Sequence, residues 1–245
     1  MNLNTLRSVD MRQIITSRLD TDLYKLTMGQ FIWSFYPLLR VRYALIDRGN
    51  TQFPEGFAQE LRRQVDLMSR LRLSGEESSY LSKLGIFNAD YLSWFEANNY
   101  KPSQVKISQY GSCLTVIIEG PWVETVYWEV PLMSLISELY YKMTGQVPEL
   151  VYPRASEMAQ NLQQAGVIWT DFGSRRRAGF EVQGQALMAA SAYMPTANTA
   201  GGLVGTSNVH WARVLGLESK GTMHMSSSWP LLPFMMTRPS EVDRS

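Results

Sequence analysis

The chain has 245 residues, with 23 Lys and Arg against 22 Asp and Glu, so its net charge is +1 and gives no support for a nucleic-acid or polybasic membrane partner. Apolar residues make up 45% and charged residues 18%, which indicates a folded globular protein, and a single cysteine excludes an internal disulfide. No segment approaches the ~18 apolar residues of a membrane span, and the first residues lack the apolar core of a signal peptide, so we expect a cytoplasmic protein.

Residues 1–150 predict an N-terminal α+β domain. Apolar residues at helical spacing predict five helices, at 20–36, 55–71, 76–84, 89–97 and 132–143. Alternating and β-branched residues predict strands at 40–47, 105–108 and 114–118, and an extended stretch over 122–130. We expect Asp20 or Thr21 to cap the first helix.

Residues 151–223 have a different pattern, in which helices alternate with short strands. The strands are predicted at 167–172, 202–205 and 219–223, and the helices at 154–165, 175–194 and 208–215. This alternation is typical of parallel βα units, and the fold class is therefore α/β overall. Each predicted strand ends in small or polar residues, at the edge where such folds bind ligands.

Two of these strand ends are candidate anion sites. Gly173–Arg177 follows a strand and opens a helix, so Arg175 and Arg176 could bind a phosphate or carboxylate, or the arginines could form a solvated face. Thr206 and Ser207 could cradle a phosphate, or the segment could simply cap the next helix. No Walker A pattern and no metal-ligand spacing occurs, so no metal site is expected.

The two histidines differ in their surroundings. His210 lies inside a predicted helix between Val209 and Trp211, where a structural role is expected. His224 follows a Gly-Thr pair at a strand end and is the better candidate for nucleophilic or acid–base chemistry.

Four segments together resemble the nicotinate phosphoribosyltransferase family, in the family's order. They are LDTDLYKL at 19–26, DFGSRRR at 171–177, LVGTSN at 203–208 and GTM at 221–223. The central GPW at 120–122 and WEVPL at 128–132 are also similar to the family.

The resemblance implies synthesis of nicotinate mononucleotide from nicotinate and phosphoribosyl pyrophosphate, coupled to hydrolysis of ATP with Mg²⁺, in NAD salvage. It also implies a homodimer, with the N-terminal α+β domain followed by the first βα units of an irregular, here incomplete, α/β barrel. Tyr24 and Thr222 are similar to residues that contact nicotinate, Tyr24 often across the dimer interface. Phe172 matches a stacking ring, and Arg175 matches a phosphate-binding arginine.

The last 22 residues depart from the family. The family motif Gly-Thr-x-Ala-His-Glu carries a histidine that ATP phosphorylates, whereas this chain reads GTMHMS, with His224 one position before the expected phosphohistidine. Reverse translation of 224–237 with allowed codons, and one G restored before it, reads Ala-His-Glu-Phe-Ile-Met-Ala-Ile-Ala-Ala-Leu-Tyr-Asp-Asp. The sequence therefore predicts that the Met- and Pro-rich residues 224–245 are an out-of-frame tail and that the chain is an inactive, truncated product; a genuinely divergent C-terminus is the alternative.

Two other functions stay open at this point. The first is a non-catalytic fragment that keeps only dimerisation or nicotinate binding. The second is a related phosphoribosyltransferase that uses nicotinamide or quinolinate.

Overall fold

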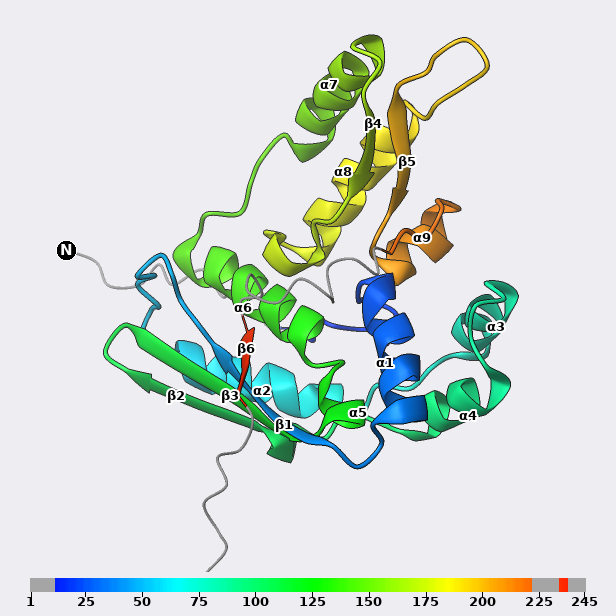
Figure 1. Ribbon diagram of the computed structural model, residues 1–245. Helices are drawn as coiled ribbons and strands as arrows, with labels where there is room; N and C mark the ends of the chain where they lie inside the picture. The colour runs from blue at the N-terminus through cyan, green and yellow to red at the C-terminus, as the bar shows by residue number, and fades with distance from the viewer. Residues whose placement is uncertain (1–11, 222–233, 238–245) are drawn as a thin grey trace, which may run out of the picture.

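The computed structural model describes residues 12–221 and the backbone of 234–237 (Figure 1). A lower part is built on a four-stranded sheet, and an upper part on two parallel strands; helix α6 and the start of helix α1 lie between them (Figure 1).

The lower sheet is antiparallel, with strand order β2-β3-β1-β6. Its strands are β1 (Arg40–Leu45), β2 (Val105–Tyr110), β3 (Cys113–Pro121) and β6 (Phe234–Thr237). In β1, Val41 and Tyr43 are buried while Arg40 and Arg42 are exposed, which is the alternation of a strand with one covered face. Strand β6 pairs with β1 and belongs to residues 224–245. This pairing does not test whether those residues are an out-of-frame tail, which stays a prediction.

Six helices and a short 3₁₀ turn complete the described lower part. They are α1 (Leu23–Phe35), α2 (Phe57–Met68), α3 (Gly75–Lys83), α4 (Ala89–Ala97), η1 (Pro102–Gln104), α5 (Trp122–Thr125) and α6 (Glu129–Thr144). Helix α2 buries the stripe Phe57, Leu61, Val65 and Met68, as its spacing predicts, and packs against α6 and β2. Helix α3 has a side-chain cap, because Ser74 and Glu77 form a capping box at its N-terminus.

The upper part contains α7 (Val151–Gln164), β4 (Ile168–Asp171), the 3₁₀ turn η2 (Ser174–Arg176), α8 (Phe180–Ser191), β5 (Gly202–Thr206) and α9 (Val209–Leu215). Strands β4 and β5 are parallel, which confirms the βα pattern. A small separate core fills the space between strands and helices; it includes Leu187, Leu203 and Trp211. Gly184 is required there because a Cβ atom at this position would overlap the Trp211 ring.

Two local predictions are wrong. Residues 122–130 are mostly helical, because α5 and α6 bury nearly every side chain of this run, and continuous burial does not distinguish strand from helix. The predicted helix 175–194 begins only at Phe180, after η2 and an extended Gly179. The predicted strand 219–223 lies only partly within the described residues, where Ser219 forms a parallel bridge with Thr206 at the end of β5.

The capping prediction for the first helix is also wrong. The N-cap residue is Asp22, whose side chain makes no capping hydrogen bond. Asp20 is instead used by Arg177, and the Thr21 carbonyl accepts from Val209 N–H. Both contacts join residues far apart in sequence, so local spacing could not reveal them.

Strands β4 and β5 both run toward the lower part, so their carboxyl ends meet the first turns of α1 and α6 (Figure 1). No helix among the residues that the structure describes is both long and apolar enough to cross a bilayer.

Candidate active site

The N-terminal segment leading into α1 docks directly on the loop that follows β5. Leu23 N–H donates to the Ser207 carbonyl (2.8 Å), Val209 N–H to the Thr21 carbonyl (2.9 Å) and His210 N–H to the Leu19 carbonyl (2.8 Å). These bonds satisfy backbone groups at the starts of both α1 and α9. Two of the segments that carry the resemblance, 19–26 and 203–208, are therefore in contact.

A buried ion pair fastens this junction. Arg177 Nη1 and Nη2 donate to Asp20 Oδ1 and Oδ2 at 2.6 and 2.7 Å, and Asn208 Nδ2 donates to Asp20 Oδ1 at 2.8 Å. Both members of the pair are almost fully buried. Burial by itself lowers the pKa of Arg177, but the charge and hydrogen bonds of Asp20 outweigh it and raise that pKa above its ordinary value. Arg177 is thus a structural cation, which corrects the view of all three arginines as a solvated face.

A second charged cluster surrounds Tyr24. Lys25 Nζ lies 2.5 Å from Glu129 Oε2, while Tyr24 Oη donates to Glu129 Oε1 at 3.4 Å. The Arg175 guanidinium lies 3.4 Å from Glu129 Oε1 and 3.7 Å from Asp22 Oδ2, and its Cζ is 5.9 Å from the centre of the Tyr24 ring. Burial, then the charge of Glu129, raise the pKa of Tyr24 far above its ordinary value, so the phenol stays a neutral hydrogen-bond donor.

Arg175 is the member of this cluster suited to an anionic ligand. Its side chain is 15% exposed, whereas those of Asp22 and Glu129 are at most 2% exposed. Its two carboxylate contacts are long compared with a charge-assisted hydrogen bond of about 2.8 Å. The guanidinium therefore keeps donor capacity for an incoming carboxylate or phosphate. Asp22 is held in a buried position that raises its carboxyl pKa, although the Ser207 hydroxyl donates to it at 2.8 Å.

The hydroxyl groups after β5 are already engaged. Thr206 Oγ1 donates to Asp171 Oδ2 at 2.7 Å, and Ser207 donates to Asp22. Asn208 caps α9, because its side chain accepts from Trp211 N–H at 3.1 Å. The capping interpretation of this loop is thus correct for Asn208, while a phosphate-binding role for Thr206 and Ser207 stays a prediction that requires these bonds to be exchanged.

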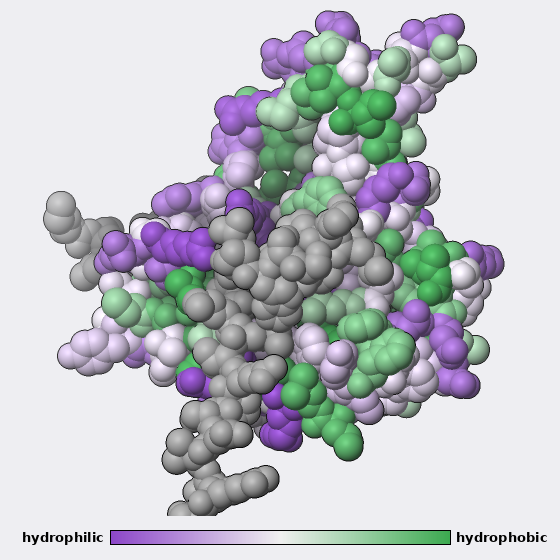
Figure 2. Space-filling model, in the orientation of Figure 1, coloured by the Kyte–Doolittle hydropathy of each residue, from purple (hydrophilic) through white to green (hydrophobic). Residues whose placement is uncertain are grey.

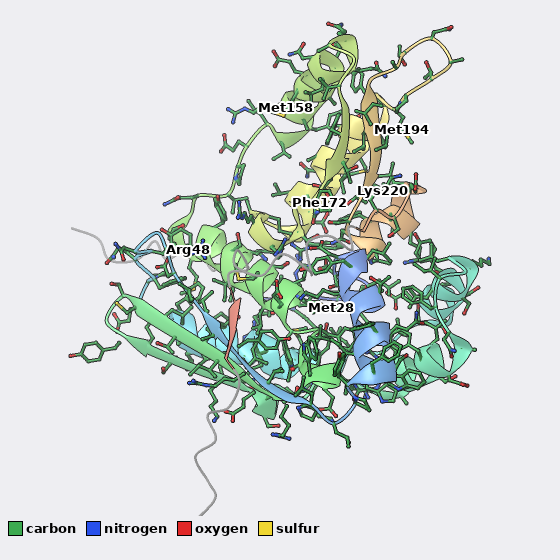
Figure 3. All side chains as sticks on the ribbon, viewed as in Figure 1. Met28, Arg48, Met158, Phe172, Met194 and Lys220 are labelled. Atoms are coloured by element: carbon green, nitrogen blue, oxygen red, sulfur yellow. The ribbon has the colours of Figure 1, made fainter. Side chains whose placement is uncertain are left out.

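The remaining predicted site residues fall into two groups. Phe172 directly follows β4, is 41% exposed, and lies where the upper part faces the lower part (Figure 3). Arg176 is exposed on η2. Thr222 and His224 lie outside the described residues, so their proposed roles stay predictions.

His210 has the expected structural surroundings. Its ring contacts Phe180 and Trp211 at centroid distances of 5.1 and 5.3 Å, and burial lowers its pKa. Within 12–221, no group of three or more His, Cys, Asp or Glu side chains could hold a metal ion.

Sequence reasoning missed Asp20, Lys25 and Glu129 as parts of the site. Glu129 did carry a signal: it is a single charge in the otherwise apolar run 126–132, and a buried charge requires a partner. The partner itself could not be read from the sequence, because Lys25 is 104 positions away.

Comparison with known proteins places these residues in context. Residues 19–137 match the model of the nicotinate phosphoribosyltransferase (NAPRTase) N-terminal domain. The nicotinate phosphoribosyltransferase of Desulforapulum autotrophicum is 41% identical over 217 residues, covering 86% of this chain and 54% of that protein. The one from Chromohalobacter salexigens is 36% identical over 213 residues, covering 85% and 53%.

Solved structures agree with this. The crystal structure of nicotinate phosphoribosyltransferase from Porphyromonas gingivalis matches with a TM-score of 0.79 at 31% identity, over 85% of this chain and 54% of that one. The Saccharomyces cerevisiae structure, described as a putative nicotinate phosphoribosyltransferase, matches with a TM-score of 0.77 at 29% identity. The chain spans about half the length of the curated relatives it matches.

Proposed function

We propose, from the premise that this chain belongs to the nicotinate phosphoribosyltransferase family, that its described residues form part of a site that transfers a phosphoribosyl group to nicotinate. The observation that carries the proposal is the partly exposed Arg175 beside the Tyr24 ring, close to the carboxyl ends of β4 and β5. A cation beside an aromatic ring suits a flat anionic ligand, which nicotinate is.

The reaction forms a bond between the pyridine nitrogen of nicotinate and C1′ of the ribose, while the C1′–O bond to pyrophosphate breaks. Positive charge develops on the sugar as that bond breaks, so positioning and fixed negative charges contribute most of the catalysis. In this chain Tyr24 and Phe172 would hold the pyridine ring, and Arg175 would bind its carboxylate or a phosphate group. The Asp22 and Asp171 carboxylates beside them supply negative charge near the strand ends.

ATP and Mg²⁺ enter the proposal as the reaction's co-substrate and its ion. No Mg²⁺ ligand is assigned among residues 12–221, where no group of three or more His, Cys, Asp or Glu side chains could hold a metal ion. The histidine that ATP would phosphorylate belongs to the motif after Gly221, outside the described residues. We also propose that β4 and β5 are the first strands of an α/β barrel, and that the active assembly is a homodimer in the cytoplasm.

We further propose that the 245-residue chain has no catalytic activity of its own. Within the described residues β4 is hydrogen-bonded along one side, to β5, and its exposed Ile168 faces no covering strand. Open parallel strands with apolar side chains favour association over a defined active site.

The test compares two proteins in a nicotinate mononucleotide assay with nicotinate, phosphoribosyl pyrophosphate and MgATP. One protein is the chain as written, and the other is translated from a reading frame with one base restored at codon 224. We expect product only from the second, and product from the first would refute the inactivity proposal. If the nucleotide sequence beyond codon 223 contains no frame encoding Ala-His-Glu and further barrel strands, the frameshift proposal fails.

The same proteins separate the alternatives. Calorimetric binding of nicotinate to the 245-residue chain without turnover would favour a binding fragment. A panel of nicotinate, nicotinamide and quinolinate, with the restored-frame protein, identifies the substrate. Because Arg175 is proposed to bind the ligand's anionic group, Arg175→Gln should weaken nicotinate more than neutral nicotinamide, whereas Arg176→Gln is the matched control on the exposed side of η2.

A further inference from the structure

Lys25 is a buried cation that the proposed reaction does not use. Hydrophilic residues on the surface gather around the outer end of α7 (Figure 2), whereas the side chains of Lys25 and its partner Glu129 are only 1% and 2% exposed. A buried ion pair is weak evidence for stability, because taking two charges out of water costs about as much as their attraction returns. The place of this pair, beside Tyr24 and Arg175, points to a role in the site.

Four charged groups share this space: the carboxylates of Asp22 and Glu129, and the cations of Lys25 and Arg175. Each carboxylate has a shorter contact with another group than with Arg175. Glu129 Oε2 lies 2.5 Å from Lys25 Nζ, and Asp22 Oδ1 accepts from the Ser207 hydroxyl at 2.8 Å. The contacts of Arg175 with the two carboxylates are 3.4 and 3.7 Å long. The lysine and the hydroxyl thus hold the carboxylates, and the guanidinium is left with weak contacts.

The backbone on both sides of Arg175 is anchored, so its side chain is the part that can respond to a change in these charges. Turn η2 is held on α6 by the Ser134 hydroxyl, which donates to the Ser174 carbonyl at 2.7 Å. On the other side, Arg177 is held by the buried Asp20 carboxylate. The guanidinium can therefore turn toward the carboxylates or toward an incoming ligand, while its Cα stays in place.

We propose that Lys25 is a positioning residue: by neutralising Glu129, it keeps the Arg175 guanidinium available to the anionic group of the ligand. The inference rests on the proposed function and adds the residue that favours an anionic over a neutral pyridine at that site. Without Lys25, the buried Glu129 carboxylate would keep only the Tyr24 phenol and the weakly bound Arg175 as contacts. An uncompensated buried charge is strongly destabilising, so Arg175 would turn inward and form a two-pronged pair with Glu129. That pair would withdraw the guanidinium from the ligand.

The reactivity of Arg175 toward phenylglyoxal tests this on the 245-residue chain without any substrate. Phenylglyoxal modifies free guanidinium groups and reacts slowly with one that a carboxylate holds. Cleavage after glutamate yields the peptide 158–181, which carries Arg175, Arg176 and Arg177 together. The exposed Arg176 and the buried Arg177 then serve as the fast and the slow reference within one peptide.

Lys25→Met should slow the modification of Arg175 at least about fivefold relative to Arg176, because the guanidinium becomes paired with Glu129. The double variant Lys25→Met/Glu129→Gln lacks that carboxylate charge and should regain the native rate. Lys25→Gln keeps a hydrogen-bond donor and removes the charge, and it decides the question by the same measure if circular dichroism shows that Lys25→Met does not fold. An Arg175 rate that is unchanged or higher in the folded single variant, or as slow in the double variant as in the single one, overturns the proposal.

Lys142→Met is the matched control on the same ion-pair chemistry. Lys142 Nζ lies 2.9 Å from the buried Glu138 carboxylate, which belongs to the same helix as Glu129. The other cation beside Glu138 is Arg177, not Arg175. Lys142→Met should therefore leave the rate of Arg175 unchanged, and an equal slowing in both lysine variants would show that loss of any lysine of this region suffices and would contradict the role of Lys25.

Protection by a ligand separates this inference from the proposed function. Nicotinate should slow the modification of Arg175 in the native chain and neutral nicotinamide should not, because only nicotinate has a carboxylate for the guanidinium. If nicotinate gives no protection, the proposed ligand of Arg175 is wrong, while the lysine variants still decide the role of Lys25. If nicotinate protects and Arg175 reacts equally fast in Lys25→Met and in the native chain, the proposed function stands and the role of Lys25 is wrong.

Discussion

Replacing Arg177 by Met should be among the most damaging single changes outside the two hydrophobic cores. The substitution keeps an unbranched side chain that reaches about as far as Nε of arginine, but it removes the guanidinium that donates twice to Asp20. One hydrogen bond, from Asn208, would then remain on a carboxylate that is fully buried. The same change also removes the cation that lies 3.6 Å from the Glu138 carboxylate.

Breaking a buried ion pair from one side costs about 3–5 kcal/mol, because the remaining charge stays without compensation. Since a domain of this kind has about 5–15 kcal/mol of unfolding free energy, the loss is a large fraction of the total. Arg176→Met is the matched control, because this neighbouring arginine is exposed and should change the unfolding free energy by less than about 0.5 kcal/mol.

Urea unfolding followed by tryptophan fluorescence measures both variants, and the double variant Asp20→Asn/Arg177→Met completes a mutant cycle. The double variant should recover much of the loss, because the uncompensated charge is gone. If Arg177→Met costs less than about 1 kcal/mol, or if the double variant is as unstable as the single one, the reasoning about this pair is refuted.

Three further predictions use the same unfolding assay. Gly29→Ala should destabilise the chain by about 1–3 kcal/mol, because the added Cβ would overlap the Tyr127 hydroxyl. Gly75→Ala is the control: a Cβ at this position meets no atom, so the substitution should be neutral or slightly stabilising. Equal effects of the two substitutions would contradict the packing argument. Burial lowers the pKa of His210, so the unfolded chain binds more protons below about pH 6.5 and stability falls as pH falls; His210→Gln should flatten this dependence between about pH 7 and 5. Burial raises the carboxyl pKa of Asp22, so as the pH falls the folded chain takes up a proton at this carboxyl before the unfolded chain does. The unfolding free energy of the native chain should therefore rise relative to that of Asp22→Asn as the pH is lowered from about 7 to 4. A constant difference between the two proteins would refute this.

The sequence predicted most of the secondary structure because burial repeats locally at a regular spacing. Helix α2 is the clearest example, since all four residues of its apolar stripe, Phe57, Leu61, Val65 and Met68, are buried. Prediction failed where nearly all side chains of a run are buried, as over 122–130, and where a distant contact sets a boundary, as at Phe180, whose N–H donates to Glu138 Oε2 at 2.8 Å.

The candidate site, too, could be predicted only in part from the sequence. Tyr24, Arg175 and Phe172 were selected from motifs, and the structure brings Tyr24 and Arg175 to within contact of each other. The triple arginine of 175–177 shows the limit of spacing, because three identical side chains in a row have three different environments. Arg177 is buried, Arg175 is partly exposed and lies beside the Asp22 carboxylate, and Arg176 is exposed.

By itself the sequence indicated the class of fold, the resemblance to a known family and the strand ends at which the candidate site residues gather. These properties depend on short-range periodicity and on motifs of a few residues, and both can be recognised in a single sequence. Only the tertiary structure decided which charges are compensated, because Asp20 meets Arg177 across 157 positions and Lys25 meets Glu129 across 104. An ion pair of that kind leaves no local pattern, because its two charges compensate each other only when both are buried side by side, and that arrangement exists only after the chain has folded.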